Sequence, residues 1–235
     1  EIEFTETDLN DLYKVADNKY RYAFEIEEVR QGLDGVTYDT SVYDAFVDIS
    51  VGKNGKLTAV KTVQLRSSEV PANTGLWARI KAFVTGNSDN VIFKNVYNAS
   101  GKIKLGVTKT LTGMNWGDAT SFDFQLKEGS NVITQLINGE KDHITVTKNS
   151  AGYTEYFNEI TYTLADLYTG GYNGTREYTY TVKEVVPNKD SQIPGVKYDE
   201  TEHKIVVTVT DMNNGKLKVT AKVDDKAAVE STPNK

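Results

Sequence analysis

Three observations on the sequence predict an all-β protein with two tandem domains. Tyr and Thr are abundant whereas Met and Pro are scarce, a composition typical of strands. Hydrophobic residues make up 38% of the chain and are spread over many short segments of alternating polarity, the pattern of half-buried strands. The length of 235 residues suits two domains of ordinary size.

The strands of the first domain follow from alternation with a period of two. In one of them Tyr22, Phe24 and Ile26 share a face, and the same period places Glu28 on that face. The Asn-Gly pair at residues 54–55 predicts a tight hairpin turn, because both residue types tolerate the positive φ that such turns require. The expected strands cover residues 20–29, 35–51, 57–65 and 91–97.

The same alternation predicts the second domain. In its first strand, Lys109 shares a face with the apolar residues Leu105, Val107 and Leu111. This places a lysine among apolar neighbours. The expected strands cover residues 103–112, 121–128, two short segments within 132–148, 156–164, 177–187, 195–210 and 216–223.

An internal repeat relates the two domains. Residues 35–60 align without gaps to residues 195–220, with the Gly-Val, Tyr-Asp and Asn-Gly-Lys-Leu segments in register. Upstream, the strand with Glu28 aligns with the strand with Glu184, but residues 104–157 have no counterpart in the first copy. We therefore expect that the sequence is an excerpt or that strands from elsewhere complete the first domain. The expected domains are residues 1–98, a short stiff linker over 99–103, and residues 104–235.

The composition excludes several classes of protein. The net charge is −6, and Lys is scattered among Asp and Glu, so the basic face that nucleic acid requires is missing. The chain has no Cys, and its two histidines, His143 and His203, are too far apart in sequence to suggest a zinc site. No segment approaches the roughly 20 apolar residues of a membrane helix. We expect no metal, no cofactor and no membrane-spanning segment.

Glu184 follows Tyr180 and Val182 on an inward face, so both Lys109 and Glu184 are expected to be buried. Buried lone charges are costly, and such groups pair, shift their pKa or react. One interpretation is a buried Lys–Glu ion pair, or a lysine that reaches to an edge. The pattern leaves both forms of this interpretation open.

The other interpretation is chemical and needs an Asn or Asp on an adjacent strand. A desolvated Lys amine is neutral and nucleophilic, so it can attack the side-chain amide carbon of Asn. The same environment keeps Glu protonated, so Glu can donate to the Asn carbonyl and move a proton. Ammonia leaves, and a Lys–Asn isopeptide bond forms once per molecule without a cofactor.

A set of motifs in fixed order carries a family resemblance: VTKTLTG, SFDFQL, EITYTL, YTYTVKEV and GVKYDETEHKIVVTVTDMNNGKLKVT. The set resembles the isopeptide-linked repeat of streptococcal-type pilins, the shaft subunits of sortase-assembled Gram-positive pili, and of related surface adhesins. The resemblance covers nearly the whole chain. It implies tandem CnaB-like, inverse immunoglobulin-type β-sandwiches, with Lys on the first strand, Glu on a central strand and Asn on the last strand in a pattern like I-x-F-x-N.

The resemblance implies specific roles for residues of this chain. Lys109 is the nucleophile of the second domain, Glu184 promotes its reaction, and Asn234 is the candidate acceptor. In the last strand of the first domain, Asn95 is the acceptor and Glu28 its promoting residue, with the Lys partner outside this chain. At the second acceptor the sequence departs from the family pattern, because Thr232 stands at the expected aromatic position and Pro233 precedes Asn234. Asn95 and Lys109 are expected to belong to successive domains and not to bond to each other.

The expected function is structural: a pilus-shaft or cell-surface stalk protein of a Gram-positive bacterium, extracellular, with adjacent pilin subunits and the sortase as partners. Beyond single-turnover self-crosslinking, no enzyme is expected, because phosphate-binding loops and catalytic triads are missing from the sequence. The alternative is an adhesin module that binds a host protein or glycan through loops such as 66–90, with Trp77 and Arg79 as a patch. Within that loop, residues 76–84 could form a helix or a strand, or cover the core.

Overall fold

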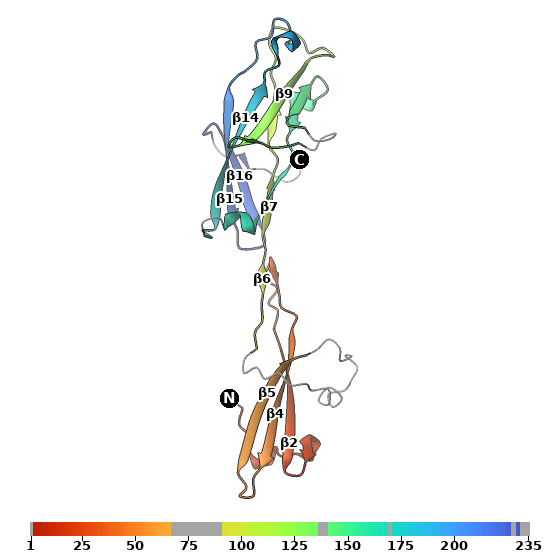
Figure 1. Cartoon of the computed structure of the whole chain (residues 1–235), viewed down its shortest axis with the longest axis vertical. Coiled ribbons are helices and arrows are strands. Elements are labelled where there is room, and N and C mark those ends of the chain that lie inside the picture. Colours follow the sequence, from red (N-terminus) through yellow and green to blue (C-terminus); the bar gives the residue numbers. More distant parts are fainter. Residues whose placement is uncertain (1, 67–90, 136–140, 169–170, 227–228, 231–235) are drawn as a thin grey trace. The chain divides into compact units, whose positions relative to one another are not determined.

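The computed structural model describes residues 2–66, 91–135, 141–168, 171–226 and 229–230. Its elements in these ranges are β-strands and short 3₁₀ helices, which confirms the all-β prediction (Figure 1). Contacts divide the chain into two compact units. Unit 1 comprises Glu1–Gly32 and Val36–Val96, and unit 2 comprises Leu33–Gly35 and Tyr97–Lys235.

Unit 1 is built on a four-stranded antiparallel sheet in the order β1-β2-β4-β5. Two short 3₁₀ helices precede it, and β3 pairs with β6 as a separate two-stranded ladder. A hairpin joins β4 to β5 at the predicted Asn-Gly turn, where Gly55 has a φ of 77°. The elements are η1 (Glu6–Asp8), η2 (Asp11–Tyr13), β1 (Lys14–Ala16), β2 (Lys19–Glu27), β3 (Val36–Thr37), β4 (Val42–Val51), β5 (Leu57–Leu65) and β6 (Val96–Tyr97), of which Val96 belongs to unit 1 and Tyr97 to unit 2.

Two predicted strands of unit 1 are shorter than expected. The strand expected over residues 35–51 is divided into β3 and β4, because Asp39 forms a side-chain turn in which its carboxylate accepts the N–H of Ser41 at 2.7 Å. The strand expected over residues 91–97 is reduced to β6, because the N–H of Lys94 donates to the Asp39 carboxylate and not to a neighbouring strand. These turn contacts bring two distant segments together.

The core of unit 1 centres on β4 and β5, where Ala45, Phe46, Ile49 and Val63 are buried. Phe24, which was expected on the inward face of β2, is 37% exposed. The described residues therefore cover only part of the sheet face that carries Phe24.

Unit 2 contains a seven-stranded sheet with the order β10-β9-β14-β15-β16-β17, and β11 also pairs with β9. Two short ladders, β7 with β13 and β8 with β12, complete the unit. The elements are β7 (Ser100–Ile103), β8 (Gly106–Thr108), β9 (Ser121–Glu128), β10 (Asn131–Val132), β11 (Ile144–Thr147), η3 (Ala151–Tyr153), β12 (Thr154–Tyr156), β13 (Ile160–Thr163), η4 (Leu164–Leu167), β14 (Thr175–Val185), η5 (Lys189–Ser191), β15 (Glu202–Asp211), β16 (Leu217–Val223) and β17 (Val229–Glu230).

Residues 99–103, expected as a linker, form part of unit 2. Ser100–Ile103 is strand β7, which pairs with β13, and the side chains of Ala99 and Ile103 are buried in the core. The apolar residues of this short segment alternate with polar ones, so burial of one face makes it a strand.

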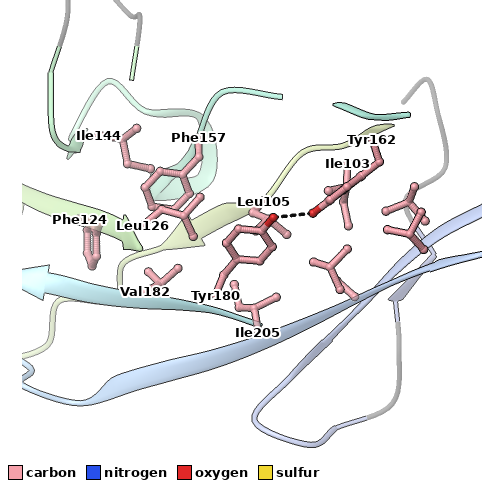
Figure 2. Packing of buried hydrophobic residues seen from close by; sticks show 14 of the residues in the cluster. Ile103, Leu105, Phe124, Leu126, Ile144, Phe157, Tyr162, Tyr180, Val182 and Ile205 are labelled. Atoms are coloured by element: carbon pink, nitrogen blue, oxygen red, sulfur yellow. Dashed lines mark hydrogen bonds between the residues drawn. The ribbon is translucent and has the colours of Figure 1, made fainter. Parts of the chain in front are cut away.

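The core of unit 2 lies between the short ladders and the large sheet. Figure 2 shows Ile103 and Leu105 facing Tyr180 and Ile205 across this core, as in an all-β sandwich. The hydroxyls of Tyr162 and Tyr180 are hydrogen-bonded at 2.7 Å inside it. Each hydroxyl therefore has a hydrogen-bond partner, so both rings can be buried.

A second polar cluster of unit 2 centres on Asp211 at the end of β15. Its carboxylate accepts hydrogen bonds from the hydroxyls of Tyr97 and Tyr172, each at 2.7 Å, and from the N–H of Asn213 at 2.8 Å. Burial alone would raise the pKa of Asp211, but these three donors lower it below its ordinary value. The ionised carboxylate thus contributes to the stability of the unit.

Removal of a buried side chain tests the position of this core. Leu126 is 1% exposed, so Leu126→Ala is expected to lower the free energy of unfolding of unit 2 by about 2–5 kcal/mol. Val132→Ala is the control, because Val132 is 37% exposed and its truncation should cost less than about 0.5 kcal/mol. Urea unfolding followed by Trp116 fluorescence in a Trp77→Phe background measures both. Equal costs would contradict the assigned core.

The Asp211 cluster predicts a pH dependence. Because the folded-state pKa lies below the unfolded value of about 3.9, the stabilisation is present above that value and is lost as the pH falls through the folded-state pKa. The stability difference between wild type and Asp211→Asn should therefore be largest near neutral pH and shrink as the pH falls below 4. The same fluorescence assay measures it, and a constant difference at all pH values would refute the assignment.

Candidate functional site

Lys109 lies directly after β8, and its side chain points into unit 2. Its N–H donates to the carbonyl of Tyr153 at 3.0 Å, which continues the pairing of β8 with the segment around β12. Alternation with Leu105 and Val107 turns the side chain inward, and it is 12% exposed. Its Nζ lies 4.6 Å from the centroid of the Phe122 ring. The amino group therefore lies next to an aromatic ring.

Glu184 lies near the end of β14, and its side chain is 2% exposed. Lys109 Nζ donates to its Oε2 at 2.7 Å, and the N–H of Asp199 donates to the same oxygen at 3.1 Å. The second oxygen, Oε1, is buried and accepts no hydrogen bond from the described residues. Glu184 is buried as predicted, Lys109 is only partly buried, and the structure brings the two side chains into contact.

A groove runs beside this pair. Its volume is about 370 Å³, and residues of β8, β14, β15 and β16 line it together with the turn that follows η5. Lys109, Glu184, Asp199 and Val223 belong to its lining. A further chain segment can thus approach Lys109 from this side.

A related arrangement occurs in unit 1 between Glu28 and Asn95, which are 67 residues apart in the sequence. Asn95 Nδ2 donates to Glu28 Oε1 at 2.5 Å. Asn95 Oδ1 accepts the N–H of Asp39 at 2.8 Å. Glu28 Oε2 is buried and, like Glu184 Oε1, accepts no hydrogen bond within the described part of the chain.

Asp39 and Asp199 occupy the same position in the internal repeat, and their turns match. The carboxylate of Asp39 accepts the N–H of Ser41, and that of Asp199 accepts the N–H of Thr201 at 3.0 Å. The hydroxyl and N–H of Ser41 and the N–H of Lys94 lower the pKa of Asp39 to about 2. Hydrogen bonds from Thr201 likewise lower the pKa of Asp199. Both turns hold an ionised carboxylate next to a predicted site.

Sequence analysis did not assign a role to either aspartate. The recurrent Tyr-Asp pair at residues 38–39 and 198–199 was the available signal, because an Asp that recurs in register marks a turn that both domains share. A turn residue is recognised as part of a site only when the strands around it are placed.

Some of the predicted residues lie outside the described part of the chain. These are Asn234, the candidate acceptor of the second domain, and residues 67–90, which include Trp77 and Arg79. Asn95 groups with unit 1 and Lys109 with unit 2.

Two searches of the described residues bear on other kinds of site. No group of three or more His, Cys, Asp or Glu side chains in the described ranges is arranged to hold a metal ion. None of the helices described is long and apolar enough to span a membrane.

Comparison with known families bears on the Lys109–Glu184 and Glu28–Asn95 contacts. The family model FctA, described as the Spy0128-like isopeptide containing domain, matches residues 1–98 and residues 105–233. No curated protein matches the chain. The two matched stretches cover nearly all of the sequence and agree with the resemblance drawn from its motifs. The chain therefore belongs to the FctA family of Spy0128-like isopeptide-containing domains.

Proposed function

We propose that this chain is a segment of a pilus shaft or cell-surface stalk of a Gram-positive bacterium, stabilised by autocatalytic Lys–Asn isopeptide bonds. Membership of the FctA family supports the structural role. The observation that carries the chemical part is the buried contact between Lys109 Nζ and Glu184 Oε2 beside an accessible groove. Extracellular display, with neighbouring subunits and a sortase as partners, belongs to this proposal.

In unit 2, Lys109 is the proposed nucleophile and Glu184 the residue that moves protons. Transfer of a proton from the Lys109 ammonium to Glu184 leaves a neutral amine, which the apolar surroundings favour. The amine attacks Cγ of the acceptor, for which Asn234 is the candidate within this chain. Glu184 returns the proton to the departing nitrogen, the Cγ–Nδ2 bond breaks, and ammonia leaves. The carboxylate of Glu184 then takes the second proton from the attacking nitrogen, which leaves a neutral amide with one N–H.

In unit 1, Asn95 and Glu28 form the other half of the same chemistry. The hydrogen bond from Asn95 Nδ2 to Glu28 Oε1 places a proton-moving group next to the nitrogen that leaves. The proposed Lys partner lies outside this chain and would contact Glu28 Oε2, the oxygen that accepts no bond from the described residues. In unit 2 the corresponding oxygen is Glu184 Oε1, which would face the acceptor amide.

Such a bond would close each domain into a covalent loop between its first and last strands. By the loop-entropy argument used for disulfides, a loop of this size contributes roughly 4–5 kcal/mol. Force applied at one end of the domain would then pass through the bond and bypass most of the fold. This accounts for how a surface stalk can be robust in a chain that has no Cys. Each molecule reacts once on itself, so the chain is not proposed to be an enzyme.

The proposed bond predicts a change in mass. Each bond releases one ammonia, so formation of the Lys109–Asn234 bond lowers the intact mass by about 17 Da. Tandem mass spectrometry after digestion should place the link between these two residues. Lys109→Met keeps an apolar stem of similar length but removes the nucleophile, so its mass should equal that of its sequence. A wild-type mass equal to the plain sequence would exclude the bond.

The proposal also predicts the effect of replacing Glu184. Glu184→Gln keeps the shape of the side chain but cannot carry a proton between nitrogens, so the bond should not form and the melting temperature should fall by several degrees. Glu177→Gln, at an exposed position of the same strand, is the matched control and should leave both unchanged. Equal crosslinking in wild type and Glu184→Gln would contradict the role of Glu184.

A further inference from the structure

The turn at Asp39 touches two consecutive residues of the acceptor strand. Its Oδ2 accepts the N–H of Lys94 at 2.7 Å, and its own N–H donates to Asn95 Oδ1 at 2.8 Å. Its Oδ1 is held by Ser41. Two contacts in opposite directions, to neighbouring residues of one strand, fix the position of that strand along its length. A shift by a single residue would break both.

These contacts also fix the orientation of the Asn95 amide. A main-chain N–H can only donate, so the Asn95 atom that faces Asp39 N–H must be the oxygen. The nitrogen then faces Glu28, at 2.5 Å from its Oε1. Oxygen and leaving nitrogen are thereby assigned to different partners.

This division suits the reaction. When an amine attacks Cγ, negative charge develops on Oδ1, and a fixed N–H donor at this position stabilises it. The carboxyl group takes a proton from the attacking amine and gives one to the amide nitrogen. The Cγ–Nδ2 bond breaks, ammonia leaves, and the new Lys–Asn amide remains. Every proton that the step needs comes from the amine itself.

In unit 2 the equivalent turn lies at the groove beside Lys109. Asp199 lines the groove, its carboxylate is held by Thr201, and its N–H donates to Glu184 Oε2. Lys109 Nζ donates to the same Glu184 oxygen. Asp199 N–H and Lys109 Nζ therefore meet at Glu184 Oε2.

We propose that Asp39 and Asp199 are positioning residues of the crosslinking reaction. The carboxylate of Asp39 fixes the register of the acceptor strand by accepting the N–H of Lys94, and its main-chain N–H donates to the Asn95 amide oxygen. Asp199 would do the same for an acceptor strand of unit 2 whose residue before Asn has an N–H. This inference rests on the function proposed above. It adds a requirement on the acceptor: the residue before Asn must carry an N–H. Lys94 meets it, whereas Pro233, before Asn234, has no N–H to donate.

The test restores the missing donor. Pro233→Lys reproduces the Lys-Asn pair of residues 94–95, so the Lys109–Asn234 bond should form about tenfold faster than in wild type, as expected for one hydrogen bond to a charged acceptor. The full chain is refolded from denaturant, and the fraction of Lys109 in an isopeptide bond is followed by tandem mass spectrometry.

Two variants separate register from folding. Asp199→Asn keeps the side-chain oxygen that holds Thr201 but replaces the second acceptor oxygen with a donor, so the gain from Pro233→Lys should disappear in this background. Asn173→Ala is the matched control, because Asn173 forms a turn of the same kind with Thr175 away from the groove, and the gain should persist. A gain that persists in Asp199→Asn would overturn the inference and leave the bond itself established.

A second acceptor makes the test independent of Asn234. A synthetic peptide with the sequence of residues 91–97 is added to the refolding chain, alongside a peptide that is N-methylated at the residue corresponding to Lys94. The unmodified peptide should link to Lys109 about tenfold faster than the methylated one. This difference in rate should disappear when Asp199 is replaced. Equal rates would overturn the inference alone. Absence of any link at Lys109, to either peptide or to Asn234, would overturn the proposed function together with it.

Discussion

The contact between Lys109 and Glu184 is the interaction on which the organisation of unit 2 depends. Lys109 follows β8 and Glu184 lies near the end of β14, and their side chains are 12% and 2% exposed. Replacement of such a pair by apolar residues is often neutral or stabilising, so stability of the fold alone does not explain its presence. The proposed reaction, which needs a desolvated amine next to a carboxyl group, would explain it.

The two units show complementary parts of the proposed site. Unit 2 shows Lys and Glu in contact, and unit 1 shows Glu and Asn in contact. In each, the glutamate has one buried oxygen that accepts no bond from the described residues. Both units contain the Asp turn at the same position of the internal repeat. The contacts of this turn in one unit can therefore be used to infer those in the other.

Much of this could be predicted from the sequence, because burial in a β-sheet follows a period of two. Alternation correctly placed Glu184 inside and Lys109 partly inside. The aligned strands of the repeat also pair alike, β2 with β4 and β14 with β15. Residues 99–103 were expected as a linker, but Ser100–Ile103 forms strand β7, because the pairing of this segment with β13 is not visible in so short a stretch of sequence. Asp39 was missed because its role depends on contacts with Lys94 and Asn95, which lie 55 and 56 positions later in the sequence. No local sequence pattern reveals such contacts. The role of Asn234 remains a prediction.

The central claim is that Lys109 Nζ becomes an amide nitrogen. Solution NMR of the chain with ¹⁵N-labelled lysine side chains and ¹³C-labelled asparagine tests this most directly. The account predicts that Lys109 Nζ carries a single proton and shows one-bond coupling to an asparagine Cγ. A Lys109 Nζ that remains an ammonium group with three protons, paired with Glu184 and uncoupled to any asparagine carbon, would contradict it and leave the buried ion pair as the whole of the site.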